Sequence, residues 1–344
     1  MTAAANESST KFASIDIGSH TIRLLIAELE QNTHIVPLRV ERTITRLARD
    51  FHNSQELSPA SMESSITALE TYQELLEDYG VGSVACGATG VFRRAANSAD
   101  FLERVRKALG LNIAILSEDS EAALSAKGIL SVLPDSENWK LLFDLGGSST
   151  EFLLVNPQRS KPVWSESIFL GAATISARYL DEDPPKIESV KLAVKSIEDQ
   201  IDQVLSEMNT AIKEAALDLD DLLLVGTAGT ATTLASMFLS AEEYQPQHIN
   251  GLVLDERWLS DTAQRLTELT IAQRQGIPGL ERGREDIILG GALVVLEILR
   301  ATKKQQFTVT DAGLLEGLLL DLIEKERGMP QVLSSPLTWL QPEE

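Results

Sequence analysis

SIDIGSHT at residues 14–21 has a counterpart in FDLGGSST at residues 143–150. In both stretches an apolar run reaches an aspartate, Asp16 or Asp144, and continues through one apolar residue into glycine and small polar residues. An alternating apolar segment follows each stretch, which predicts two β-hairpins with tight turns. Two such hairpins about a domain apart indicate a duplicated fold with a cleft between the copies.

Strand-like apolar runs alternate with helical patterns along most of the chain, which indicates an α/β fold. The longest helical pattern places apolar residues from Val190 to Ile212 on one face. Another helix is expected from Ser117, with acidic residues in the first turn, where the helix dipole favours them. The expected strands are 12–18, 21–28, 81–87, 112–116, 141–147, 152–155, 222–226 and 307–311, and the other expected helices are 59–79, 99–109, 286–299 and 314–326.

The composition is that of a globular protein large enough for two domains, with 344 residues, 43% hydrophobic and 24% charged. No apolar run reaches the roughly 18 residues of a membrane helix. The polar segment from Met1 to Thr10 is expected to be a disordered leader rather than a signal peptide, and the tail after Pro330 is expected to be loose. The single cysteine, Cys86, excludes an intramolecular disulfide and is expected to be buried, and cytoplasm is the default location.

The net charge of the chain and its few cysteine and histidine residues limit the macromolecules and metal ions that it is expected to bind. A net charge of −21 disfavours nucleic acid and anionic membranes. One cysteine and four scattered histidines leave a hard, oxygen-bound metal as the expected kind. Residues 39–49 nevertheless carry a local basic excess, which is either part of an anion site or an exposed basic face. The charged residues of this segment are Arg39, Glu41, Arg42, Arg46 and Arg49.

The two repeated turns have the chemistry of phosphate loops. Glycine and serine leave backbone N–H groups open to phosphate oxygens, and an aspartate at a strand end can hold Mg²⁺ directly or through water. One Asp-x-Gly turn is usually structural, whereas two copies favour a function. The loop residues are Gly18, Ser19, Gly146, Gly147 and Ser148.

A third glycine turn, GTAGT at residues 226–230, joins an apolar strand to a helix. A glycine turn that leads into a helix N-terminus makes an anion site, here with Gly226, Gly229 and Thr230. The alternative is a tight turn in which Thr230 caps the helix.

Glu121 is the candidate general base. Hydrolysis of a phosphoanhydride needs a positioned water, and a carboxylate can orient it and accept its proton. The alternative is that Glu121 is only a first-turn acid of its helix. Thr89 and Arg93 can offer a hydroxyl and a guanidinium to phosphate, although Arg93 also fits an exposed helix start.

In their order along the chain, these blocks resemble the exopolyphosphatase/guanosine pentaphosphate phosphohydrolase (Ppx/GppA) family of the actin-like ATPase superfamily. The resemblance runs from about Phe12 to about Leu322, and its blocks are collinear. The blocks are DIGSHTIRLLI at 16–26, RL at 46–47, ATGVFRRAAN at 88–97, LSEDSEAAL at 116–124, DLGGSSTE at 144–151, SIFLGA at 167–172, GTAGT at 226–230, RED at 284–286 and GLLEG at 313–317.

The resemblance implies two ribonuclease-H-like domains around a cleft, at residues 12–128 and 129–313, with the helix 314–327 completing the first domain. It implies that Mg²⁺, with Mn²⁺ as a substitute, supports removal of terminal phosphate from inorganic polyphosphate or guanosine pentaphosphate. The chain looks like the short two-domain form of the family. The implied roles are water activation for Glu121, metal and phosphate carboxylates for Asp16, Asp144 and Glu151, phosphate loops for Gly18, Ser19, Gly146, Gly147 and Ser148, and substrate-facing cations for Arg23, Arg46 and Arg93.

The sequence departs from the family pattern at three positions. His20 stands where the first loop usually has asparagine, Ser148 replaces a third glycine, and Leu315 replaces an arginine. Ser148 adds a Cβ atom to the second loop and Leu315 removes a cation, so both bear on substrate choice and on activity.

Two other functions stay open at this point. An ATP-dependent phosphotransferase on the same scaffold would consume ATP only when an acceptor is present. A catalytically silent sensor of guanosine tetra- or pentaphosphate would bind tightly without turnover. The preference between polyphosphate and guanosine pentaphosphate, and the formation of a homodimer, are also open.

Overall fold

The computed structural model describes residues 10–30, 34–49, 51, 55–133, 138–156 and 162–328. The predicted leader before Thr10 and the predicted loose tail after Pro330 lie outside these ranges. The chain forms two compact units, the first made of Met1–Ser117 with Leu314–Glu344 and the second of Glu118–Gly313. Within the described ranges, no helix combines the length and the apolar character needed to cross a membrane.

The first unit is a five-stranded sheet with helices on both faces. Its strands follow the order β3-β2-β1-β4-β5, in which β1 pairs antiparallel with β2 and parallel with β4. The elements are β1 (Lys11–Ile17), β2 (Thr21–Glu30), β3 (His34–Ile44), α2 (Pro59–Tyr79), β4 (Ser83–Ala88), the 3₁₀ helix η1 (Gly90–Arg93), α3 (Ser98–Leu109), β5 (Ile113–Ile115) and α12 (Leu314–Arg327).

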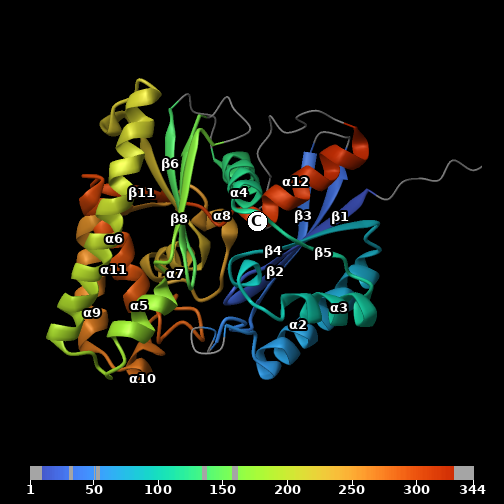
Figure 1. Cartoon of the computed structure of the whole chain (residues 1–344), viewed down its shortest axis with the longest axis horizontal. Coiled ribbons are helices and arrows are strands. Elements are labelled where there is room, and N and C mark those ends of the chain that lie inside the picture. Colours follow the sequence, from blue (N-terminus) through green and yellow to red (C-terminus); the bar gives the residue numbers. More distant parts are fainter. Residues whose placement is uncertain are drawn as a thin grey trace, which may run out of the picture. The chain divides into compact units, whose positions relative to one another are not determined.

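Alternation along β1 sends its side chains to two different layers. Ile15 and Ile17 pack into the core beneath α2 and α3, because successive strand residues point to opposite faces. Ser14 points the other way, and its Oγ donates a hydrogen bond of 2.6 Å to the carbonyl of Leu315 in α12. Figure 1 shows α2 and α3 along one face of this sheet and α12 along the other.

The second unit is a six-stranded sheet with the order β10-β11-β9-β6-β7-β8. Apolar residues of β6 and β7 form one core with α6, α7, α9 and α11 and another core, on the opposite face, with α4 (Figure 1). The elements are α4 (Glu118–Val132), β6 (Lys140–Leu145), β7 (Thr150–Val155), β8 (Trp164–Ile168), α5 (Ala172–Tyr179), α6 (Ile187–Glu214), β9 (Leu223–Thr227), α7 (Ala228–Leu239), α8 (Pro246–Ile249), β10 (Val253–Asp255), α9 (Glu256–Glu268), α10 (Ile271–Arg274), α11 (Ile288–Ala301) and β11 (Gln306–Val309).

The two sheets repeat one topology, which confirms the predicted duplicated α/β fold. In each sheet three antiparallel strands, β1-β2-β3 or β6-β7-β8, are followed by parallel strands on the far side of the first, and the second sheet adds the antiparallel edge strand β10. The hairpin turns also match, since Gly18 N donates to Thr21 O and Gly146 N donates to Ser149 O, both at 3.0 Å.

The helix after the last strand of each copy completes the other copy. Helix α12 follows β11 but packs on β1 and β4, and α4 follows β5 but packs on β7 and β8. The division of the chain therefore falls before α4, whereas the domain boundary predicted at 128/129 runs through this helix. Packing explains the difference, because Ala126 and Ile129 of α4 share a core with Leu142 and Leu153.

Three strands were absent from the sequence prediction: β3, β8 and β10. The basic segment 39–49 begins within β3, so its arginines lie on an edge strand of the first sheet and beyond its end. Charged residues and Pro37 interrupt the apolar alternation of β3, which hid the strand in the sequence.

Candidate active site

A row of four polar residues crosses the sheet of the second unit. Asp144 on β6 stands directly opposite Glu151 on β7, Glu151 stands opposite Ser167 on β8, and Asp144 stands beside Thr227 on β9. Residues in register on neighbouring strands share a face of the sheet. The face is the one that α4 covers. Leu142 and Leu153 pack against that helix, and each lies two residues from Asp144 or Glu151 on the same strand, so it points to the same face.

The two carboxylates of this row form a like-charge pair. Burial raises the pKa of Glu151 to about 8, and the negative charges of Glu121 and then Asp144 push it in the same direction. Hydrogen bonds from the hydroxyls of Ser149 and Ser167 oppose the shift, and Ser167 Oγ lies 3.0 Å from Glu151 Oε1. Like charges opposite each other destabilise a sheet, so this site favours a cation.

Glu121 lies in the first turn of α4, together with Glu118 and Asp119. Its charge reaches Glu151, as the raised pKa of Glu151 shows. The fold of the second unit thus brings together three carboxylates that the sequence analysis had singled out, Glu121, Asp144 and Glu151.

The loop between β6 and β7 is fixed through its carbonyl groups. Gly147 O accepts hydrogen bonds from Ala173 N at 2.8 Å and from Thr174 N at 3.1 Å, at the start of α5. Among the described residues, no acceptor is found for the N–H groups of Gly147 and Ser148. With its carbonyls held on one side, the loop can offer these N–H groups to an anion.

Gly171 makes this support possible. A Cβ atom at Gly171 would lie 2.4 Å from the carbonyl oxygen of Gly147, so any side chain there would displace the loop. The sequence analysis had quoted Gly171 only as part of the family pattern and had given it no role.

The loop between β1 and β2 is supported in the same way by the segment after β3. His20 O accepts from Thr45 N at 3.0 Å and from Arg46 N at 2.9 Å. Arg46 has a positive φ of 51°, so the end of β3 turns sharply there and stays bonded to the loop. Ser19 Oγ also accepts from Val91 N at 3.3 Å. This bond ties the loop to η1.

The first unit contains three other predicted residues. Thr89 is buried and precedes η1, and its N–H donates to Ile17 O at 3.3 Å. Arg23 stands directly opposite Asp16 in the hairpin. Arg93 donates from Nη1 to Leu116 O at 3.3 Å.

Two of the departures from the family pattern, Leu315 and Ser148, lie in different parts of the structure. Leu315 is fully buried, and its carbonyl accepts the bond from Ser14, so its side chain belongs to the core of the first unit. Ser148 lies in the loop of the second unit, where its carbonyl accepts a hydrogen bond of 3.3 Å from Thr174 Oγ1.

The third glycine turn is shaped mainly by close packing. A Cβ atom at Gly226 would lie 2.3 Å from the Phe143 ring, and Thr230 is buried against Gly291. The N-cap of α7 is Thr227, so Thr230 does not cap this helix. Gly229 faces the guanidinium of Arg284, which lies 2.1 Å from the place of a Cβ atom. Arg284 thus adds a buried cation beside this turn that the sequence analysis did not assign.

The carboxylates fit a hard cation with few protein ligands. No group of three or more His, Cys, Asp or Glu side chains in the described ranges is arranged to hold a metal ion. Mg²⁺ does not need such a group, because it commonly binds one or two carboxylates together with water and substrate phosphate. Asp144 and Glu151 are suited to this mode.

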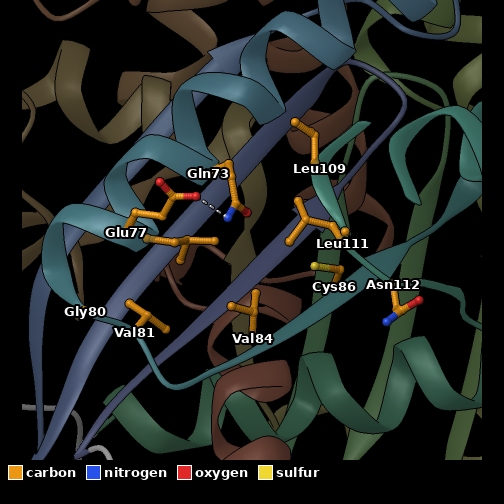
Figure 2. Close-up of a pocket in the computed structure, with 11 residues that line it drawn as sticks. Gln73, Glu77, Gly80, Val81, Val84, Cys86, Leu109, Leu111 and Asn112 are labelled. Atoms are coloured by element: carbon orange, nitrogen blue, oxygen red, sulfur yellow. Dashed lines mark hydrogen bonds between the residues drawn. The ribbon is translucent and has the colours of Figure 1, made fainter. Parts of the chain in front are cut away.

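A cavity of about 320 Å³ lies elsewhere in the first unit. Figure 2 shows it lined by Gln73 and Glu77 of α2, by Leu111, and by Val84 and Cys86 of β4. Val84 and Cys86 point to the face beneath α2 and α3, whereas Asp16 points to the opposite face. Burial raises the pKa of the Cys86 thiol to about 12, which agrees with the buried cysteine expected from the sequence. This cavity is separate from the candidate site.

Comparison with known proteins identifies similar sequences over nearly the whole chain. A family model described as the Ppx/GppA phosphatase family matches residues 25–326. Exopolyphosphatase 2 of Mycobacterium tuberculosis is 29% identical over 325 residues, which cover 91% of this chain and 98% of that protein. A bifunctional 3-dehydroquinate synthase/phosphatase of Fusobacterium nucleatum is 28% identical, and the match spans 91% of this chain but only 47% of that protein.

Solved structures have the same fold. The Aquifex aeolicus member of the Ppx/GppA family superimposes with a TM-score of 0.74 and 28% identity, over 92% of this chain and 98% of that one. An exopolyphosphatase from Cytophaga hutchinsonii superimposes with a TM-score of 0.81 and 21% identity, over 94% of this chain and 100% of that one.

Proposed function

The chain belongs to the Ppx/GppA phosphatase family, and we propose that it is a magnesium-dependent phosphohydrolase that removes terminal phosphate from inorganic polyphosphate. The observation that carries the proposal is the like-charge pair Asp144 and Glu151, which lies beside Glu121 on one face of the second sheet. The relatives named exopolyphosphatase support polyphosphate as the substrate class.

Asp144 and Glu151 would hold Mg²⁺, or Mn²⁺ in its place. When bound, the ion would neutralise charge on the phosphoryl group during transfer. Its positive charge would favour the ionised forms of Asp144 and Glu151, against the burial and the neighbouring negative charges that raise the pKa of Glu151. The metal role expected for Asp16 stays a prediction, because Asp16 stands opposite the positive charge of Arg23.

Glu121 would orient the attacking water and accept its proton. A general base needs a carboxylate near the reacting phosphate, and Glu121 has this position if phosphate binds at Asp144 and Glu151.

The glycine loops would bind phosphate oxygens through backbone N–H groups. In the second unit these donors are Gly147 and Ser148, held in place by the start of α5. In the first unit the corresponding loop contains Gly18 and Ser19, with Arg46 bonded to it. Arg23, Thr89, Arg93 and the Gly226, Gly229 and Thr230 turn are the further phosphate-binding candidates of the proposal.

Phosphate release tests the proposal directly. The purified chain is given long-chain polyphosphate with Mg²⁺, and parallel samples receive guanosine pentaphosphate or an excess of EDTA. We expect release from polyphosphate that stops in EDTA and returns with Mg²⁺ or Mn²⁺. Release only from guanosine pentaphosphate would change the substrate. Tight binding without release would instead indicate a sensor.

A further inference from the structure

The cavity of about 320 Å³ in the first unit lies where two helices end. Gly80, which ends α2, and Gly110, which ends α3, both line it. Each glycine has a left-handed backbone, with φ of 65° and 70°, at which the chain leaves the helix. The C-terminus of a helix carries a partial negative charge. Two such ends beside one cavity therefore favour a positively charged ligand.

The side chains that line the cavity carry one charge, that of Glu77. Glu77 lies in the last turn of α2, which contains no basic residue, and in the part of the chain that the structure describes it forms no ion pair. Its Oε1 accepts a hydrogen bond of 3.0 Å from Gln73 Nε2, which leaves the Gln73 Oε1 atom as an acceptor. A carboxylate near a helix C-terminus is unfavourable for the helix, so a bound cation would stabilise this end.

The basic residues near these helix ends have other contacts. Lys11 Nζ donates to Tyr79 O at 3.1 Å. At the end of α3, Arg106 Nε lies 2.8 Å from Glu103 Oε2 and Lys107 Nζ lies 3.2 Å from Glu103 Oε1. None of these basic residues lines the cavity, so its electrostatic character is that of Glu77 and the two helix ends.

Most of the remaining lining is apolar. Figure 2 shows Cys86 and Leu111 across the cavity from Glu77, with Val84 below them and the amide of Asn112 nearby. An apolar cavity of about 150 Å³ holds one benzene molecule. The volume of about 320 Å³ therefore suits a ligand of about a dozen non-hydrogen atoms.

We propose that this cavity binds a small organic cation, in which a protonated amine is joined to a compact apolar body. The ammonium group would lie against the carboxylate of Glu77 and donate to the amide oxygens of Gln73 and Asn112. The apolar body would fill the space over Val84 and Leu111. A few convergent polar groups in a mainly apolar cavity are typical of small-molecule sites.

This site goes beyond the proposed hydrolysis and does not depend on it. Val84 and Cys86 point to the face of the sheet beneath α2 and α3, and Asp16 points to the opposite face. Ligand binding can therefore be measured without polyphosphate or metal.

Calorimetric titration with three matched probes tests the site. Phenylbutylammonium, phenylbutanol and phenylbutyrate share one apolar body and differ in the charge of the head group. We expect the wild type to bind the ammonium most tightly and the carboxylate least. Glu77→Gln should weaken binding of the ammonium by about three- to fivefold and remove its advantage over the alcohol. Glu74→Gln, which removes the same charge from an exposed position of α2 outside the cavity, should bind like wild type.

Two further measurements locate the ligand. Cys86 lines the cavity and is the single cysteine of the chain, so the rate of its alkylation by iodoacetamide reports occupancy. Saturating phenylbutylammonium should slow this reaction. Val84→Phe places a larger side chain in the cavity and should weaken binding of all three probes.

Several results would overturn the site. Equal affinities for the three probes, or equal losses in Glu77→Gln and Glu74→Gln, would indicate attraction by the overall negative charge alone. Unchanged alkylation of Cys86 under saturating ligand, or unchanged binding by a folded Val84→Phe variant, would place the ligand elsewhere. Melting temperature shows whether each variant is folded, and the comparison of Glu77→Gln with Glu74→Gln decides if Val84→Phe is not.

Discussion

The two hairpins of this chain share a backbone but carry opposite electrostatics. In each, an aspartate near the end of the first strand faces a residue on the second, and a glycine N–H closes the turn at 3.0 Å. The partner of Asp16 is Arg23, and the partner of Asp144 is Glu151. The first copy thus places a positive charge opposite its aspartate, and the second copy places another carboxyl group there.

The two copies share the way in which their loops are supported, and they differ in the charges beside the loops. Both copies hold the loop carbonyls through N–H groups of a later segment, the residues after β3 in one and the start of α5 in the other. In the second copy, the carboxyl group of Glu151 has a strongly raised pKa. Duplicated loops therefore fit phosphate binding in both units, and the acidic row fits a metal and catalysis in one.

Glu121→Gln gives the largest expected effect, because it removes the proposed general base from the acidic copy. The value of kcat for polyphosphate should fall by ~10²- to 10⁴-fold, while the Kd for polyphosphate and the melting temperature change little. Glu118→Gln, in the same first turn and exposed, is the control for loss of a helix-dipole charge and should keep normal kcat. Near-normal turnover in Glu121→Gln would end the assignment of this residue.

Glu151→Gln tests the cost of ionising a buried carboxyl group beside the negative charges of Glu121 and Asp144. The pKa of Glu151 is raised to about 8 in the folded state, above an unfolded value near 4.3. In EDTA, its contribution to wild-type stability is thus full below about pH 4 and is lost as pH rises through about 8. Relative to wild type, the free energy of unfolding of Glu151→Gln should rise by on the order of 5 kcal/mol between about pH 4 and pH 8.

The first hairpin supplies the control for this measurement. Arg23→Gln should keep the wild-type pH dependence between pH 4 and 8, and Mg²⁺ should restore stability at pH 8 to the wild type but not to Glu151→Gln. Parallel pH profiles for wild type and Glu151→Gln would contradict the raised pKa of Glu151.

Gly171→Ala should break the support of the second loop. Its Cβ atom would lie 2.4 Å from Gly147 O, so either the loop or α5 has to move, at a cost of about 1–3 kcal/mol. We expect a lower free energy of unfolding by urea and a higher KM for polyphosphate. Gly276→Ala is the matched control, since the nearest atom to its Cβ would be at an ordinary 3.6 Å. Equal stabilities for the two variants would contradict the packing argument.

Ser167→Ala should have the smallest effect. It removes the 3.0 Å hydrogen bond to Glu151 Oε1, which orients one of the two carboxylates offered to the metal. Loss of such an orienting bond typically weakens metal binding by ~10-fold, so the Mg²⁺ concentration for half-maximal activity should rise while kcat at saturating Mg²⁺ is kept. A fall in kcat that excess Mg²⁺ does not repair would assign Ser167 a different role.

Local patterns in the sequence carried much of this structure. The predicted helix at 59–79 agrees with α2, because Ser58 caps it and Gly80 ends it in a left-handed conformation. The long helix predicted over 190–212 lies within α6, where Ile197, Ile201 and Val204 are buried. The register of a hairpin follows from the length of its turn. The pairs Asp16–Arg23 and Asp144–Glu151 could therefore also be predicted from the sequence.

Only the tertiary structure decided the contacts that join distant segments. Ser167 meets Glu151 because β8 pairs with β7, and Thr227 stands beside Asp144 because β9 crosses over to β6. Arg42 meets Arg23 on a strand whose charges and proline concealed it, and Gly171 matters only because α5 returns beneath the loop. Sequence determined the hairpins, the helices and the chemical types of the site residues, since these depend on short-range periodicity and turn geometry. Strand order and cross-strand neighbours depend on burial shared by residues far apart in the chain, so they became visible only when the sheets were assembled.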